Sequence, residues 1–267
     1  MPGVTALSDQ RRLAVLIDAD NAQSNLIGPL LEEVATFGTA SVRRAYGDWT
    51  GTQLSGWKRD LNAHAIQPMQ QFSYTKGKNS TDSALIIDAM DLLHTGNLDG
   101  FVLVSSDSDF TRLATRLREA GKVVIGIGER KTPQPFVAAC ERFIYSDLLG
   151  ANSDPVEPAP VETEAPARVP DLERILRPAI ENTAGDDGWS TLSAVGSHLS
   201  KSNPSFDPRD YGRSRQLGAL VEEQPYVEVK RPRAGGGAIR VRLRPAAPAG
   251  KATAARRTPT KKAAAKS

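Results

Sequence analysis

The chain has 267 residues, of which 39% are hydrophobic and 24% charged, which is enough for one large or two smaller domains together with polar segments. No apolar run approaches the roughly 18 residues of a membrane span, and the N-terminus lacks a signal-peptide pattern, so we expect a cytoplasmic protein with no membrane partner. Cys140 is the single cysteine, which excludes an internal disulfide and a cysteine-based zinc site.

The net charge of +3 is distributed unevenly along the chain. Residues 246–267 contain six lysines and arginines and no acid, which predicts a disordered basic tail suited to a polyanionic partner. Residues 149–169 are rich in Pro, Ala and Glu and contain no aromatic residue, which predicts a disordered acidic linker. These two segments leave a first domain at 11–148 and a second at 170–245.

Strand-like and helix-like patterns alternate through the first domain. Apolar or alternating runs predict strands at 13–17, 41–46, 66–72, 101–105 and 123–128. Runs with helical periodicity predict helices at 27–38, 54–65, 80–96 and 110–121. The proline in the third strand favours a position near a sheet edge. Strands that alternate with helices at this spacing predict an α/β fold, with a parallel sheet covered by helices on both faces.

The second domain has a different pattern. The segment DLERILRPAIENT at 171–183 predicts a helix, and the residues after it predict two more helices and a strand. The glycines of AGGG (234–237) predict a turn, and AIRVRLR (238–244) alternates apolar and basic residues as an edge strand does. Three helices followed by a hairpin are the layout of a small winged-helix domain, which commonly binds nucleic acid.

Acidic residues follow two of the most apolar strands. LAVLI is followed by Asp18, and the run VLVSSDSDF places Asp107 and Asp109 directly after a strand. Because the carboxyl ends of parallel strands share one edge, we expect these acids to lie together, with Asp82 at the start of a helix beside them. Crowded carboxylates repel one another unless a cation lies among them, and oxygen-only ligands favour Mg²⁺ or Mn²⁺, which can activate water at a phosphodiester.

Three of these acids also have a purely structural alternative. Asp18 could cap a helix that begins near Gln23, and Asp82 could be a favourable acid in the first turn of its helix. Asp109 could be the N-cap of the helix that follows it. Asp88 and Asp91 are expected on the solvated face of their helix.

Three segments of the first domain, in order, are LAVLIDADNAQ, KGKNSTDSALIIDAM and GFVLVSSDSDFTRLATRLREAGKVVIGIG. Together they resemble the NYN domain of the LabA-like group over about residues 11–148. The resemblance implies a PIN-like Rossmannoid fold and a metal-dependent ribonuclease. It also implies that the catalytic, metal-binding acids are Asp18, Asp82, Asp107 and Asp109, and that Asn21 positions the scissile phosphate or a water.

The second domain resembles an OST-HTH/LOTUS domain, chiefly through SNPSFDPRDYGRSRQLGALVEEQPYVEVK and IRVRLR. This resemblance implies RNA binding, and single-stranded RNA is one candidate partner. Basic residues of the first domain that could line a groove for RNA are Arg43, Arg44, Lys58, Arg59, Lys76 and Lys78. The nearby aromatic residues Tyr46, Trp49 and Trp57 could stack on bases or pack in the core.

Two other functions stay open. A non-catalytic RNA-binding regulator would use the second domain and the tail alone, with acids that bind metal only weakly or structurally. A haloacid dehalogenase-like phosphatase would use the Asp-x-Asp pair of Asp18 and Asp20, although Ala22 stands where that motif favours threonine or valine.

Overall fold

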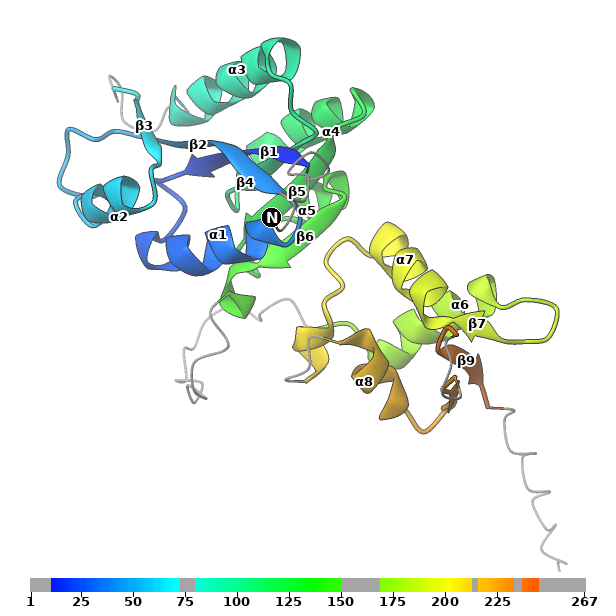
Figure 1. Cartoon of the computed structure of the whole chain (residues 1–267). Coiled ribbons are helices and arrows are strands. Elements are labelled where there is room, and N and C mark those ends of the chain that lie inside the picture. Colours follow the sequence, from blue (N-terminus) through cyan, green and yellow to red (C-terminus); the bar gives the residue numbers. More distant parts are fainter. Residues whose placement is uncertain (1–10, 73–79, 150–168, 213–215, 233–236, 245–267) are drawn as a thin grey trace, which may run out of the picture.

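The computed structural model describes residues 11–72, 80–149, 169–212, 216–232 and 237–244 (Figure 1). The predicted basic tail lies outside the described residues, as does the predicted linker apart from Leu149 and Val169. Among the residues that the structure describes, no helix is long and apolar enough to cross a lipid bilayer.

A parallel sheet of six strands forms the centre of the first domain. The strands are β1 (Arg12–Asp18), β2 (Thr39–Gly47), β3 (Gln67–Gln70), β4 (Gly100–Val104), β5 (Val123–Gly128) and β6 (Arg142–Tyr145). Their spatial order is β3-β2-β1-β4-β5-β6, so the chain first builds outward from β1 and then starts again at β4 on its other side. In sheets of this kind, the crevice outside the carboxyl ends at this reversal point is where ligands bind.

Helices cover both faces of the sheet, which confirms the predicted α/β class. The helices of one face are α1 (Ile27–Ala35) and α2 (Trp57–Ala63), and those of the other are α3 (Ser80–Thr95), α4 (Thr111–Glu119) and α5 (Gln134–Ala139). Successive residues of a strand point to opposite faces, so Leu16 of β1 packs with α3, α4 and α5 whereas Ile17 packs with α1 and α2. Both faces of the strands are therefore apolar.

The five predicted strands are present, and β3 with its proline is an edge strand that pairs only with β2. The helix α5 and the strand β6 were not predicted, because six and four residues are too short for a clear periodic pattern. The helix α1 ends at Ala35, three residues before the predicted stop at Gly38, and a 3-10 turn, Ser24–Leu26, precedes it.

The second domain has three helices and a small antiparallel sheet, in agreement with the predicted winged helix. The helices are α6 (Leu172–Thr183), α7 (Leu192–Ser202) and α8 (Leu217–Glu222), and the strands are β7 (Ser190–Thr191), β8 (Val227–Lys230) and β9 (Arg240–Leu243). The strand order is β7-β9-β8, so the predicted hairpin gains a short third strand. Its core contains Leu176, Val195, Leu220 and Val241.

The second domain contacts the first along the edge strand β6. The N–H of Phe143 donates to the carbonyl of Pro204 at 2.9 Å. This bond gives a partner to a backbone N–H that would otherwise be unpaired on an edge strand. Arg209, whose side chain is 9% exposed, donates to Glu33 of α1 at 2.9 Å and to Asp207 at 2.8 Å. A largely buried ion-pair network thus joins the two domains.

Candidate metal centre at the sheet edge

Asp18, the last residue of β1, is held at the sheet edge by hydrogen bonds to both of its carboxylate oxygens. The Ser105 hydroxyl, just after β4, donates to Oδ2 at 2.9 Å. Nδ2 of Asn21 donates to the same oxygen at 2.7 Å. The N–H of Asp20 donates to Oδ1 at 3.2 Å. These bonds, from two neighbouring strand ends, fix the orientation of the carboxylate.

Burial sets the protonation behaviour of Asp18. The residue is 1% exposed, and this burial raises the pKa of its carboxyl group. The hydrogen bonds from Asn21 and Ser105 stabilise the charged form and partly oppose the rise in pKa. A cation at this edge would offset the same cost of burying a negative charge.

Asp82, Asp107 and Asp109 form a group that we call the three-acid cluster. Each contributes one carboxylate oxygen, and these oxygens lie within 4.8 Å of one another. Asp82 is in the first turn of α3, on the same buried stripe as Leu85 and Ala89, three and seven residues later. That spacing places the three side chains on one face of a helix, so the packing of α3 on the sheet also turns Asp82 inward.

The loop after β4 brings Asp107 and Asp109 to the same edge. Asp107 is the N-cap of a 3-10 turn, Ser108–Phe110, and its Oδ1 accepts a hydrogen bond from the N–H of Asp109 at 2.9 Å. The helix α4 begins one residue after this turn, and its N-cap position is occupied by Phe110. Asp109 therefore does not cap α4, and that structural alternative for Asp109 is wrong.

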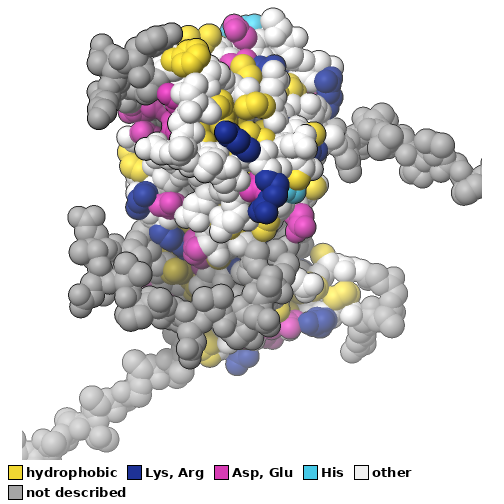
Figure 2. Space-filling model, turned by 90° about the vertical axis from the view of Figure 1, so that its left-hand side faces the viewer, with side chains coloured by type: hydrophobic (Ala, Val, Ile, Leu, Met, Phe, Trp, Pro, Cys, Tyr) yellow, Lys and Arg dark blue, Asp and Glu magenta, His cyan; other side chains and the backbone are white. Residues whose placement is uncertain are grey.

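The three-acid cluster is electrostatically strained. The pKa of Asp82 is raised to about 6, first by burial and then by the charges of Asp18, Asp107 and Asp109. Asp82 is 9% exposed whereas Asp109 is exposed, so water screens this repulsion only in part. On the face shown in Figure 2, acidic side chains gather near the upper left, whereas lysines and arginines lie singly. A divalent cation would remove the repulsion, and oxygen-only donors suit Mg²⁺ or Mn²⁺.

The structure brings three of the four predicted metal ligands together. Asp18 lies beside the three-acid cluster, and its charge raises the pKa of Asp82. Among the described residues, however, the oxygens that lie within 4.8 Å of one another come from the cluster and not from Asp18. Two residues of this edge were not among those predicted for the metal site. Ser105 donates a hydrogen bond to Asp18. Its position at the end of an apolar strand is the feature of the sequence that could have indicated this role. Asp20 accepts a hydrogen bond from the Thr81 hydroxyl at 3.1 Å, a contact that no local pattern indicates.

Two of the basic residues predicted to contact RNA already have protein partners. Arg43 donates to the carbonyl oxygen of His64 at 2.9 Å. Arg44 forms an ion pair with Asp88 of α3, and Asp88 also accepts a hydrogen bond from the hydroxyl of Tyr46. The expectation that Asp88 lies on a solvated face is therefore wrong, because it faces the sheet and ties α3 to β2.

The other predicted basic residues are placed differently. Lys58 and Arg59 are exposed on α2, while Lys76 and Lys78 lie outside the described residues. Of the aromatic residues, Tyr46 is 1% exposed and Trp57 is 4% exposed, so both belong to the core. Stacking on bases is thus disfavoured for these two side chains.

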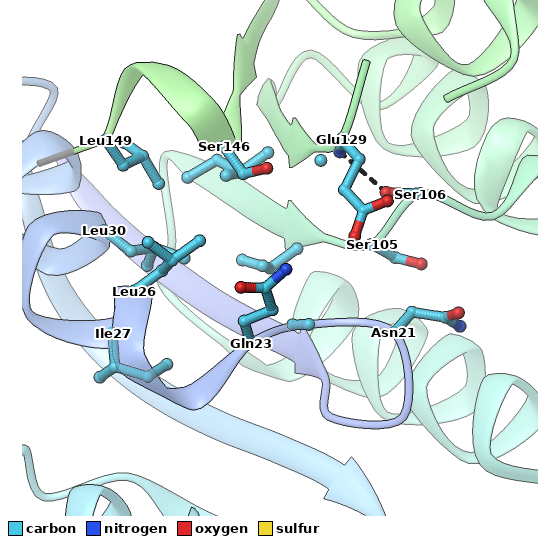
Figure 3. Close-up of a pocket in the computed structure, with 14 residues that line it drawn as sticks. Asn21, Gln23, Leu26, Ile27, Leu30, Ser105, Ser106, Glu129, Ser146 and Leu149 are labelled. Atoms are coloured by element: carbon cyan, nitrogen blue, oxygen red, sulfur yellow. Dashed lines mark hydrogen bonds between the residues drawn. The ribbon is translucent and has the colours of Figure 1, made fainter. Parts of the chain in front are cut away.

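A pocket opens beside Asp18 at the reversal point of the sheet (Figure 3). It encloses about 30 Å³, roughly the room that one or two water molecules need. Apolar side chains, among them Leu26, Ile27, Leu30, Val104, Ile127 and Leu149, line its walls. Figure 3 shows the Gln23 amide and the Glu129 carboxylate reaching into the pocket from different sides.

Comparisons with protein families agree with the fold of both domains. The NYN domain family matches residues 12–148, and the OST-HTH/LOTUS domain family matches residues 168–239. A search of curated proteins found no match.

Several solved structures are similar to parts of the chain. A Vibrio parahaemolyticus protein of unknown function is 19% identical, with a TM-score of 0.45, over 52% of this chain and 96% of that one. A Chromobacterium violaceum protein is 37% identical, with a TM-score of 0.25, over 32% of this chain and 92% of that one. An uncharacterized Nitrosomonas europaea protein is 22% identical, with a TM-score of 0.26, over 34% and 90%. Since the NYN match spans more than half of the 267 residues, the chain belongs to the NYN domain family and carries an OST-HTH/LOTUS domain after it.

Proposed function

We propose that this protein is a metal-dependent ribonuclease that hydrolyses RNA phosphodiester bonds at the three-acid cluster. A PIN-like nuclease domain followed by an OST-HTH/LOTUS domain indicates an RNA-related function. The observation that carries the step to hydrolysis is the convergence of Asp82, Asp107 and Asp109 at the edge where the strand order reverses. Such a group of acids suits a cation that also binds phosphate.

The three-acid cluster would hold Mg²⁺ or Mn²⁺ directly. Asp18, whose carboxylate orientation is fixed by Ser105, Asn21 and the N–H of Asp20, would add its negative charge beside the same cation. When bound, the cation would lower the pKa of a water molecule and neutralise charge that develops on the phosphate. Three carboxylates would supply only oxygen ligands and would leave coordination positions for water and phosphate.

The residues beside the acids would position the substrate. The amide of Asn21 is fixed by its hydrogen bond to Asp18 and lies in the loop between the acids and the pocket, so it would orient the scissile phosphate. The pocket itself encloses only about 30 Å³, so a base next to that phosphate would lie across its mouth, where Gln23 and Glu129 would contact its polar edges.

Two other functions have different degrees of support. A phosphatase of the haloacid dehalogenase type would need Asp18 as an accessible nucleophile, but Asp18 is 1% exposed and hydrogen-bonded at both oxygens. A non-catalytic RNA-binding protein is the second candidate. It is favoured by the pairing of Arg43 and Arg44 inside the first domain, which leaves RNA binding to other surfaces.

Cleavage of labelled single-stranded RNA tests the proposal. The full-length protein is incubated with Mn²⁺, Mg²⁺ or EDTA, alongside Asp107→Asn and the matched control Asp91→Asn, an exposed acid on α3. We expect cleavage with a divalent cation, none with EDTA, a loss of roughly 100-fold in Asp107→Asn, and no loss in the control. Binding without cleavage in every metal would replace this proposal with the non-catalytic one, and turnover of a phosphate monoester would favour a phosphatase.

A further inference from the structure

We propose that the second domain binds single-stranded RNA on the outer face of its small sheet, with Trp189 as the platform on which a base stacks. This surface, which we call the Trp189 face, consists of Trp189, Lys230, Arg240, Arg242 and Arg244. The inference deepens the proposed function and rests only on its RNA-binding part, not on cleavage.

Strand alternation separates an apolar inner face of the sheet from a basic outer face. Val241 of β9 is fully buried in the domain core, and Leu243 packs against that core. Arg240, Arg242 and Arg244, which alternate with these two residues, therefore point to the opposite side of the sheet. Lys230 of β8 lies directly across from Arg240 of β9, so its side chain joins the same face.

Trp189 precedes β7 and lies among these cations. The Arg242 guanidinium carbon is 4.6 Å from the centre of the indole ring, and that of Arg240 is 6.0 Å away. Nζ of Lys230 is 5.9 Å from the same ring. Aromatic rings and guanidinium planes are the surfaces on which proteins stack unpaired bases, and neighbouring cations hold the phosphates. Trp189 is partly exposed, unlike the buried Trp57 of the first domain.

The charge of the Trp189 face is complementary to RNA. Asp187 pairs with Arg240 at 2.6 Å, and Glu228 pairs with Arg242 at 2.8 Å. Four cationic side chains against these two acids leave a net charge of +2. The ion pairs also hold the two arginines beside the indole ring before any ligand arrives, which lowers the entropy cost of binding.

The last helix of this domain is a poorer surface for nucleic acid. In many winged-helix proteins the last helix lies in the major groove of a DNA duplex. Here that helix is α8, LGALVE, which contains no lysine or arginine and ends at Glu222. Its residues Leu220 and Val221 are buried in the core. The major groove of an RNA duplex is moreover too narrow for a helix, so an unpaired strand on the sheet fits the domain better.

Fluorescence anisotropy tests this inference independently of catalysis. The full-length protein, in EDTA, is titrated against labelled single-stranded RNA and against the same sequence as a duplex. The variants are Trp189→Ala, Trp189→Phe and Lys230→Ala, and the matched control is Lys201→Ala, an exposed lysine of α7. Tryptophan fluorescence is recorded in the same titrations, because a stacked base quenches the indole.

We expect Trp189→Ala to weaken single-strand binding about tenfold, Trp189→Phe to restore most of it, and duplex binding to be weak throughout. Lys230→Ala should reduce the slope of log affinity against log salt by roughly 1, whereas Lys201→Ala leaves it unchanged. Quenching should disappear in Trp189→Phe while binding persists. The proposal would be overturned if the unsubstituted protein did not bind the single strand, or if Trp189→Ala bound it as tightly as the unsubstituted protein does. It would also be overturned if Lys201→Ala reduced the salt slope as much as Lys230→Ala does. Cleavage and binding are separate readouts: if Asp107→Asn lost cleavage but kept its affinity for RNA, the result would test the metal centre and would leave the Trp189 face supported by the binding data alone.

Discussion

Replacing Asp82 with asparagine should stabilise the protein when no divalent cation is present. In the native fold the pKa of Asp82 is about 6, compared with an ordinary value of 3.8. Each pKa unit corresponds to about 1.4 kcal/mol, so ionising Asp82 at pH 7.5 costs the fold at most about 3 kcal/mol. Partial screening by water reduces this cost to about 1–2 kcal/mol. Asparagine has nearly the same shape and no charge, so it removes the cost.

The sign of the effect depends on pH. Because the native pKa is raised, the folded protein binds this proton more tightly than the unfolded chain does. The cost is therefore absent below about pH 4, grows as the pH rises through about 6, and is complete at pH 7.5. The stability difference between Asp82→Asn and the unsubstituted protein should follow the same course.

Thermal unfolding in EDTA at pH 4, 5, 6 and 7.5 measures this difference. At pH 7.5 we expect Asp82→Asn to unfold about 3–8 °C higher, with the gap closing toward pH 4. Added Mn²⁺ should raise the midpoint of the unsubstituted protein but not that of the variant, because a ligand stabilises only the fold that binds it. Asp91→Asn is the control for a neutralised acid on the same helix. A variant that is less stable in EDTA at pH 7.5, or a gap that does not change with pH, would refute the reasoning.

Three further predictions concern other parts of the molecule. Asp88→Ala leaves the half-buried Arg44 without its carboxylate and should cost about 2 kcal/mol in urea unfolding; an unchanged midpoint would contradict it. Arg209→Ala removes the side chain that joins Glu33 to Asp207 and should speed hydrogen exchange at the N–H of Phe143, which bonds to Pro204 of the second domain; unchanged exchange would be the opposing result. Deleting residues 246–267 should weaken RNA binding and flatten its salt dependence, whereas an unchanged salt slope would contradict an electrostatic role for the tail.

Local patterns in the sequence were sufficient to predict most of the first domain. The strand at 123–128 forms with its predicted ends, because its apolar run is bounded by a helix-ending glycine and a loop. The acids after β1 and β4 were expected at one edge because parallel strands end together, and the three-acid cluster lies at that edge. Both predictions rest on rules that hold for any parallel sheet.

The features that were missed depend on contacts between residues far apart in the chain. Asp88 is in the same helix as Asp91, and only the packing of α3 on β2 determines that Asp88 meets Arg44 while Asp91 stays exposed. Arg209 and Glu33 are 176 positions apart, and their contact exists only because the second domain covers β6. The short strand β7 gives no periodic signal, although its pairing with β9 brings Trp189 beside the arginines.

Manganese binding measured by electron paramagnetic resonance tests the central claim most directly. Free Mn²⁺ gives a strong signal that is lost on binding, so titration of the full-length protein reports the number of sites and their affinity. The account predicts a site that is lost in Asp107→Asn and retained in Asp91→Asn. A protein that binds no Mn²⁺, or that binds it equally well after Asp107→Asn, would contradict a metal centre at this edge of the sheet.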